Sequence, residues 1–394
     1  MAGVRIRRAC VGLALLVVLA GLFLSGCTAG GERGEKAEVL VINVGKGDAI
    51  LVKTRGRAYL IDAAKAERWG MVQSMLKQEG VTSLNGVFLT HTDKDHAGGL
   101  TPLAQSGIEV GAWYASGYCL DYGHGEKHPA VQAAALRGRE VTWLYAGDGV
   151  DGLFDVLAPS VAATDKDDNN SLVMMLNAGG GKVLLTGDME FPEEEVLLNS
   201  GAALGCDILK VANHADNDTM SEAFANAARP KLALISTDPY EKTGTPDAGL
   251  LSRLEAVGTQ VYRTDFTEAG LRATLEAGGA KVESVSWNAR PARCETVSIS
   301  EIDVAGDRLT LRNAGGEAVA LDGWYLYSSR GGEFFAFPAG TQLSAGASAT
   351  VGGRSAGTVD FLWDEKRVIH KSKEDVLTLY DSWGRAVSSV AANG

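Results

Sequence analysis

Hydrophobic residues occur along most of this chain in short runs separated by polar or glycine-containing turns, a pattern typical of strands. The segment "EVLVINVGKGDAILVKTRGRAYLIDAA" at 38–64 predicts three strands, with "RGR" as the turn before the last one. Further strands are expected in the apolar runs at 84–90, 109–116, 140–146, 152–159, 171–188, 206–214, 231–237, 260–265 and 270–287. Helical spacing is expected at 66–79, 98–107, 221–230 and 249–258.

The order of these elements predicts two domains in the 394-residue chain. Two runs of strands with helices between them favour a layered α/β sandwich over residues 38–287. After a linker at 288–294 the pattern changes to short alternating strands, many glycine turns and no helical spacing. Residues 295–394 are therefore expected to form a small all-β sandwich.

The first 26 residues have the features of a secretory signal peptide rather than of a folded element. Three arginines precede the apolar run "VGLALLVVLAGLFL", which ends in "LSGC" at Leu24–Cys27. These four residues resemble a bacterial lipobox, and that resemblance implies a lipidated Cys27, a tether over 27–37 and an extracytoplasmic location on the cell membrane. The alternative is an ordinary signal peptide or a membrane anchor.

The charge balance limits the classes of partner. The formal net charge of −12 becomes −15 once residues 1–26, with three arginines and no acid, are removed. An acidic chain is unsuited to avid, nonspecific DNA binding, although a local basic site stays compatible with it. Cys119, Cys206 and Cys294 lack the spacing of a cysteine zinc site, so we expect buried, unreactive thiols.

The candidate chemistry lies in "FLTHTDKDHAGGL" at 88–100, where four residues with ligand chemistry follow a predicted strand. Imidazole nitrogens and carboxylate oxygens are ligands for divalent metals, and such metals can activate water. A sharp loop can direct these side chains to two adjacent metals, and the glycine pair that follows permits a tight turn into a helix. The four residues are His91, Asp93, Asp95 and His96.

Two more polar residues follow apolar runs in the same way. Asp188 ends "VLLTGD" and His214 ends "ILKVANH". Taken alone, Asp188 suits the cap of a helix starting in "MEFPEEE", and His214 suits an ordinary surface position. The shared pattern with the first cluster favours the ligand interpretation.

At this point the chain resembles the metallo-β-lactamase superfamily, and more closely the branch that contains the extracellular hydrolase-like domain of the competence protein ComEC. The resemblance rests on "VINVGKGDAILVKTRGRAYLIDAA", "HTDKDHAGG", "NNSLVMML" with "LLTGD", "LKVANHADNDTMSEAFANAARPKLALIS" and "YRTDFTEAG", in this order. It covers about residues 38–287 and implies an αββα sandwich.

The resemblance also implies roles for individual residues around two metal ions, Zn²⁺ or Mn²⁺. Asp188 would bridge the ions, and Asp95 could also orient the water that attacks a phosphorus or carbonyl centre. Lys210 would hold an anionic group of the substrate. The implied metal ligands are His91, Asp93, Asp95, His96, Asp188 and His214. The implied supporting residues are Asp48 and Asp62 behind the ligand loops and Asn170 and Ser171 along the site.

Two positions depart from the family pattern. Asn213 stands where the branch usually has a first histidine before His214, and Ala64 stands where a glycine is expected. The missing imidazole leaves activity open. His124 and His128 belong to a segment that could cover the site and supply a proton, with a solvated loop as the alternative, and His370 falls in the second domain.

Residues 295–391 resemble a lamin-tail domain, through "ISEIDVAGDRLTLRNAGGEAVALDGWYLYSS", "FAFPAGTQLSAGASATVGG" and "VLTLYDSWGRAV". That resemblance implies an immunoglobulin-like sandwich that is a binding, positioning or purely structural module of unknown ligand. Our leading hypothesis is a surface-anchored, metal-dependent hydrolase of phosphodiester bonds, similar to a nuclease. The alternatives are a non-catalytic binding lipoprotein of the same fold and a β-lactamase, against which the carboxylate-rich cluster argues.

Overall fold

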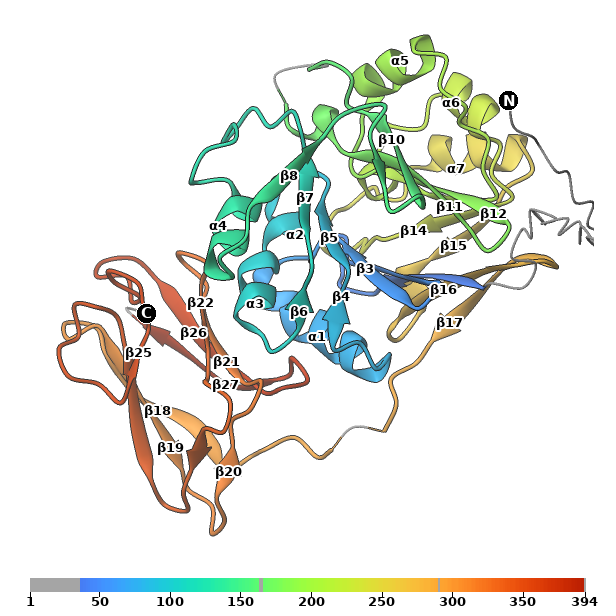
Figure 1. Cartoon of the computed structure of the whole chain (residues 1–394). Coiled ribbons are helices and arrows are strands. Elements are labelled where there is room, and N and C mark those ends of the chain that lie inside the picture. Colours follow the sequence, from blue (N-terminus) through green and yellow to red (C-terminus); the bar gives the residue numbers. More distant parts are fainter. Residues whose placement is uncertain (1–35, 163–165, 290, 393–394) are drawn as a thin grey trace, which may run out of the picture. The chain divides into compact units, whose positions relative to one another are not determined.

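The computed structural model describes residues 36–162, 166–289 and 291–392. The expected signal peptide, Cys27 and nearly all of the tether lie outside the described residues. The expected fold is confirmed for both parts of the chain: strands and helices alternate up to Val285, and only strands follow from Val297 (Figure 1). None of the described helices is long and apolar enough to cross a membrane.

The first sheet of the N-terminal part has eight strands. In spatial order they are β17 (Gly279–Val285), β16 (Gly270–Glu276), β1 (Ala37–Ile42), β2 (Ile50–Thr54), β3 (Arg57–Ile61), β5 (Gly86–Leu89), β7 (Trp113–Ser116) and β8 (Val141–Leu144). Pairing is antiparallel from β17 to β3 and parallel from β3 to β8. Short β4 (Ser83–Leu84) and β6 (Glu109–Val110) pair beside it.

The second sheet has seven strands. They are β15 (Gln260–Arg263), β14 (Leu232–Ile235), β13 (Ile208–Lys210), β12 (Gly181–Leu185), β11 (Val173–Ala178), β10 (Phe154–Ala158) and β9 (Gly149–Val150). The strands from β12 to β15 are parallel, so the loops that follow β12, β13 and β14 leave the sheet at the same edge.

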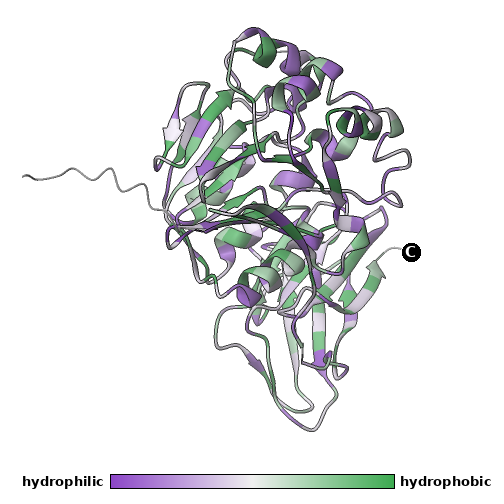
Figure 2. Ribbon diagram, turned by 90° about the vertical axis from the view of Figure 1, so that its right-hand side faces the viewer, coloured by the Kyte–Doolittle hydropathy of each residue, from purple (hydrophilic) through white to green (hydrophobic). Residues whose placement is uncertain are grey.

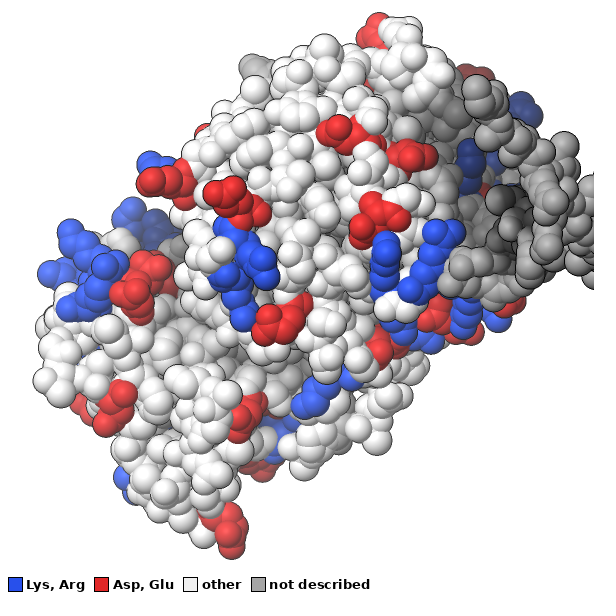
Figure 3. Space-filling model, in the orientation of Figure 1, with Lys and Arg blue, Asp and Glu red and all other residues white. Residues whose placement is uncertain are grey.

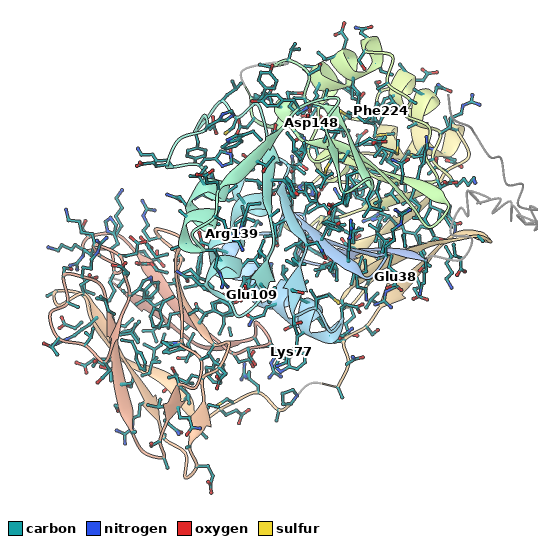
Figure 4. The ribbon with its side chains drawn as sticks, in the orientation of Figure 1. Glu38, Lys77, Glu109, Arg139, Asp148 and Phe224 are labelled. Atoms are coloured by element: carbon teal, nitrogen blue, oxygen red, sulfur yellow. The ribbon has the colours of Figure 1, made fainter. Side chains whose placement is uncertain are left out.

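The two sheets pack face to face, and helices cover their outer faces. One apolar core lies between the sheets, and one lies under each helix layer. The strands are largely hydrophobic, whereas the outer helices carry hydrophilic bands (Figure 2). Phe224, labelled in Figure 4, is fully buried under the second helix layer. The helices are α1 (Trp69–Gln78), α2 (Lys94–Ala97), α3 (Leu100–Gln105) and α4 (Pro129–Leu136) in the first half, and α5 (Phe191–Asn199), α6 (Glu222–Ala228) and α7 (Ala248–Ala256) in the second.

The structure corrects two local expectations. Residues 129–136 form α4, where no helix was expected: Pro129 stands at its first position and His128 caps its N-terminus by accepting a hydrogen bond from the Ala130 N–H. In addition, Asp188 does not cap α5, because that helix begins at Phe191 with Glu190 at the cap position.

The C-terminal part is a β-sandwich around its own apolar core, which includes Trp324 and Trp363. One sheet contains β18 (Val297–Asp303), β19 (Arg308–Asn313), β24 (Ser348–Gly352) and β25 (Phe361–Leu362). Another contains β22 (Glu333–Ala336), β21 (Tyr325–Ser328), β26 (Asp375–Tyr380) and β27 (Ala386–Ala392). Short β20 (Val319–Ala320) and β23 (Gln342–Leu343) pair separately.

Candidate metal centre

The predicted ligands meet at one edge of the two-sheet sandwich. His91 follows β5, and Asp95 and His96 lie on the short helix α2. Asp188 follows β12 of the other sheet, and His214 follows β13. Because the ends of parallel strands share one edge of a sheet, side chains more than a hundred residues apart in sequence converge there.

Asp188 is at the centre of this group. Its Oδ2 lies 3.2 Å from His96 Nε2 and 3.1 Å from His214 Nε2. The two imidazole Nε2 atoms are 3.3 Å apart, and His214 Nε2 is 3.6 Å from Asp95 Oδ2. The rings of His91 and His96 are also neighbours, with centroids 4.2 Å apart.

The ligand atoms form overlapping groups of three, within each of which all atoms lie within 4.8 Å of one another. One group contains Asp95, His96 and His214, and another contains His91, His96 and Asp188. A further group joins His91 and Asp93 to Asp168. All six predicted ligands therefore belong to one continuous cluster, in which Asp188 lies between two sets of ligand atoms.

Asp168 was not predicted from the sequence. It begins a short 3-10 turn, Asp168–Asn170, directly before β11, and its Oδ1 lies 3.5 Å from His91 Nε2. In the sequence, Asp168 could have been noticed only because it stands immediately before "NNSLVMML". It belongs to the polar run "DKDDNN", which does not directly follow an apolar strand as the other candidates do. Together with His91 and Asp93 it gives the second set of ligand atoms three members.

The histidines are oriented by partners behind them. His96 Nδ1 donates to Asp62 Oδ2 at 2.8 Å, and Asp62 also accepts hydrogen bonds from the Thr90 N–H and hydroxyl. His214 Nδ1 donates to the Ser236 carbonyl at 3.0 Å. Each ring thus presents Nε2 to the cluster, the arrangement by which proteins fix metal-binding imidazoles.

Asp48 and Lys210 form a buried ion pair behind His214. Lys210 Nζ lies 2.6 Å from Asp48 Oδ2, and both side chains are 1% exposed. The ammonium also donates to the Val211 carbonyl. Asp48 thus lies behind the cluster, and the burial of Lys210 does not support direct contact between its ammonium and a substrate.

Ser171 and Asn170 differ in their relation to the cluster. Ser171 Oγ accepts a hydrogen bond from the Asp188 N–H at 3.1 Å, so this serine fixes the central carboxylate. Asn170 is fully buried, and its amide donates to the Lys166 carbonyl.

Close backbone packing holds the loop 88–100 in place. A Cβ on Gly99 would lie 2.0 Å from the Ala63 carbonyl oxygen, and Gly99 itself has ordinary helical backbone angles. A Cβ on Gly47 would lie 2.6 Å from the Asp95 carbonyl oxygen, and here φ is also +145°. At Gly99, glycine is therefore required because the Ala63 backbone packs against it, and not because of a tight turn as expected.

Burial and mutual charge shift the pKa values in the cluster. Burial alone would raise the pKa of Asp95, but electrostatic interaction with the neighbouring His96 and His214 imidazoles contributes to lowering it to about 2. Burial also opposes ionisation of Asp188, yet the same two imidazoles hold its pKa well below the usual range. Burial and the repulsion of Asp93 raise the pKa of Asp168 to about 7.

Two buried atoms in the cluster have no hydrogen-bond partner among the described residues: His91 Nε2 and Asp188 Oδ1. Buried polar atoms are normally paired, and a pair of orphaned atoms at one place calls for an explanation. A nitrogen and an oxygen aimed into a His/Asp cluster are suitable ligands for a divalent ion. The residues present therefore fit the metal that the fold implies.

The Asn213 side chain pairs with an aspartate that is not one of the predicted ligands. Its amide donates to Asp218 Oδ1 at 3.1 Å, while the next residue, His214, supplies the Nε2 beside Asp188. Asn213, His214 and Ala215 all have positive φ, 43°, 52° and 64°. A run of non-glycine residues in this sparsely populated region marks a functional constraint.

The remaining histidines lie outside the cluster. His124 stacks on Trp143 with centroids 3.9 Å apart, and His128 is buried as the cap of α4. Burial lowers the pKa of His128 to about 4. His370 belongs to the C-terminal part, where its Nδ1 accepts hydrogen bonds from the N–H groups of Ser372 and Lys373.

The three cysteines of the described residues form no disulfide bond. Cys119 is buried, and Cys206 and Cys294 are partly buried. Burial raises the pKa of Cys119 to about 11 and that of Cys206 to about 12, which keeps these two thiols protonated at neutral pH.

Charged side chains are interspersed on the face shown in Figure 3, where basic groups lie beside acidic ones. This distribution agrees with the acidic composition and gives no extended basic stripe among the described residues of that face. On this face, an anionic partner would therefore meet no continuous basic surface.

Comparisons with known proteins agree with this architecture. The family model described as the metallo-beta-lactamase superfamily matches residues 42–238, and that of the Lamin Tail Domain matches residues 290–394. Competence protein ComA of Neisseria gonorrhoeae is 31% identical over 264 residues, which are 65% of this chain and 36% of that protein. ComE operon protein 3 of Bacillus subtilis is 28% identical over 252 residues, 58% of this chain and 32% of that protein.

The chain spans only 27% of a third relative, Recombination protein 2 of Haemophilus influenzae, which is 28% identical over 235 residues, 58% of this chain. It thus covers about a third of the length of these curated relatives. Among solved structures, the metallo-beta-lactamase fold protein YhfI from Bacillus subtilis aligns with a TM-score of 0.40 and 14% identity over 61% of this chain and 100% of that one.

Proposed function

The chain belongs to the metallo-β-lactamase superfamily, in its ComEC-like branch, and ends in a lamin tail domain; from this premise we propose that it is a metal-dependent hydrolase of phosphodiester bonds. The observation that carries the proposal is the cluster around Asp188, in which two sets of ligand atoms adjoin. Two neighbouring sets match the requirement of a two-metal centre.

The ligands divide between the two sets. His91, Asp93 and Asp168 would hold one ion, while Asp95, His96 and His214 would hold the other. Asp188 lies within reach of both sets and would be shared. Such ions, when bound, supply a nucleophilic water at neutral pH and stabilise negative charge that develops on the substrate.

The other residues of the chain prepare this centre. Asp62 and the Ser236 carbonyl keep the Nε2 atoms of His96 and His214 directed inward. Ser171 fixes the Asp188 backbone. The Asp95 carboxylate lies 3.6 Å from His214 Nε2 and could accept a hydrogen bond that orients the attacking water.

The chemistry of the ligands supports a phosphodiester over a β-lactam substrate. Four carboxylates and three imidazoles make a harder ligand set than an imidazole-rich one, and hard oxygen ligands suit Mn²⁺ as well as Zn²⁺. One relative is named for recombination, a process of nucleic acids. The Asn213 amide is engaged with Asp218, and the cluster contains three imidazoles without a side chain from position 213. Both observations support the catalytic hypothesis over a non-catalytic binding protein.

Metal content and turnover test the proposal. Purified protein should carry one to two Mn or Zn per chain by elemental analysis and hydrolyse bis-p-nitrophenyl phosphate. Asp95→Ala should lower kcat about a hundredfold or more, as expected for loss of a group that holds the reacting centre. Metal-free protein with no activity after metal addition, or activity unaffected by Asp95→Ala and His96→Ala, would overturn it.

We also propose that the mature chain is lipid-anchored at Cys27 on the outer side of the cell membrane, on the basis of the "LSGC" sequence. The protein should then fractionate with membranes, and its N-terminal peptide should carry a lipid mass on Cys27. Cys27→Ser should remove that mass. An unmodified N-terminus at another residue would contradict the anchor.

A further inference from the structure

The loop between β1 and β2 brings a lysine to the edge of the metal centre. Lys46 Nζ contacts Asp95 Oδ2. The loop has little freedom at this point, because the Asp48 N–H donates to the Asp95 carbonyl at 3.0 Å and Ser236 Oγ donates to the Gly47 carbonyl at 2.6 Å. The backbone directly after Lys46 is therefore tied to the helix that carries Asp95 and to Ser236, whose carbonyl accepts a hydrogen bond from His214.

Lys46 differs from the buried lysine in its accessibility. Its side chain is 21% exposed and that of Asp95 is 10% exposed, whereas Lys210 and its partner Asp48 are 1% exposed. Separating Lys210 from Asp48 would leave two buried charges that water cannot solvate. The Lys46 ammonium can leave its partner and still reach solvent or a ligand.

The Lys46 side chain places a cation beside the cluster, because a lysine ammonium is ordinarily protonated at neutral pH. Its Nζ contacts Asp95 Oδ2 at this edge.

Three basic side chains of neighbouring loops pair with other carboxylates. Lys65 and Arg68 both pair with Glu241, and Lys242 pairs with Asp216. Their carboxylate partners are not members of the ligand cluster.

We propose that Lys46 is the residue that binds an anionic oxygen of the substrate's phosphate group at the metal centre. The inference rests on the proposed function. It replaces Lys210, which is too deeply buried, with a lysine that touches a ligand of the centre and reaches the surface.

The exchange of partners follows from the chemistry of Asp95. A carboxylate that serves as a metal ligand has its negative charge largely neutralised, which weakens its attraction for a neighbouring ammonium. The lysine side chain, a mobile point charge with three donors, is then available to a phosphate oxygen. Its flexible stem permits this change without movement of the tied loop.

Binding of inorganic phosphate to the Mn-loaded protein tests this role without turnover. We expect Lys46→Met to weaken phosphate binding about tenfold to a hundredfold in calorimetric titrations, the range for one charge-assisted hydrogen bond. Lys46→Arg should recover part of the affinity. Lys242→Met is the matched control, because it removes a nearby lysine that pairs with a different carboxylate, and it should bind phosphate like the natural protein.

Elemental analysis and thermal unfolding of the same variants separate this role from others. Metal content and Tm should stay the same in Lys46→Met, because the lysine is neither a ligand nor buried. With bis-p-nitrophenyl phosphate, KM should rise by the same factor as the dissociation constant of phosphate. Equal phosphate affinity in the natural protein and Lys46→Met, or no phosphate binding by the natural protein, would overturn the inference even if hydrolysis is observed. Phosphate binding that depends on Lys46 would uphold it even if no hydrolysis is found, so its failure and that of the proposed function can be told apart.

Discussion

Substitution of Lys210 by methionine should destabilise the fold without a specific effect on substrate binding. Methionine keeps the length of the apolar stem but removes the ammonium that lies 2.6 Å from Asp48 Oδ2, and both side chains are 1% exposed. Asp48 Oδ1 has no hydrogen-bond partner among the described residues, so the carboxylate depends on this lysine. Removing one partner of a buried ion pair typically costs about 3–5 kcal/mol.

Urea unfolding followed by circular dichroism measures this cost as a lower midpoint at an unchanged slope. The double variant Asp48→Asn/Lys210→Met should be more stable than the sum of the two single effects predicts, because neither charge is then left buried alone. Lys231→Met is the control: its ammonium pairs with Asp207 at 2.8 Å, but the lysine side chain is 72% exposed, so the midpoint should hardly change.

Kinetics distinguish this structural role from the role that the family resemblance implied. If Lys210 acts only through the fold, KM for bis-p-nitrophenyl phosphate should stay unchanged at a temperature where the variant is folded. A natural urea midpoint combined with a KM raised tenfold would refute the reasoning, because it would mean that the ammonium reaches the substrate.

Four further predictions concern other features. Gly47→Ala should weaken Mn²⁺ binding in calorimetric titrations, because its Cβ would press on the backbone of a ligand, whereas Gly107→Ala, with open space around it, should not. Asp168→Asn should reduce the metal content from two ions toward one and weaken binding about tenfold or more, as measured by elemental analysis and titration. Asn213→Ala should leave metal content unchanged, and a loss of metal would show that the amide is needed at the centre. The pKa of His128 is about 4 in the folded chain, below its ordinary value of 6.5, so its contribution to stability is complete above pH 6.5 and is lost as the pH falls toward 4. Urea unfolding should therefore show about 2 kcal/mol less stability at pH 5 than at pH 7.5. His128→Asn should reduce that difference.

The alternation of apolar runs and polar residues, together with the family resemblance, was sufficient to predict the layers of the fold and six side chains that the structure brings into one cluster. Strand ends are recognisable in sequence, because a buried run must stop where the chain reaches the edge of a sheet. Asp168 was missed because it lies on an isolated 3-10 turn, and no apolar run leads into it. Asp168 lies beside His91 because of the way the two sheets pack, and the sequence around Asp168 alone does not reveal that packing.

The burial of Lys210 was, by contrast, readable from the sequence. It lies inside the apolar run "ILKVA", and a central parallel strand is covered on both faces. A lysine in such a strand has to be paired inside the protein. Lys46 could not be ranked in the same way, because the glycine-flanked loop that carries it has no periodicity, and its direction is set by contacts with Asp95 and Ser236.

The backbone gives a physical reason for asparagine at position 213. Residue 213 has φ 43° and ψ 43°, a left-handed conformation that asparagine tolerates better than most other non-glycine residues. Its amide also donates to Asp218, which anchors the turn. The turn must be held firmly, because His214 adopts the same conformation and has to present Nε2 to Asp188 at 3.1 Å. The cluster contains three imidazoles without one at position 213, and Asp168 offers a further ligand atom beside His91. The departure at Asn213 is thus consistent with a metal centre whose ligand set is completed from the other side, by a carboxylate before β11.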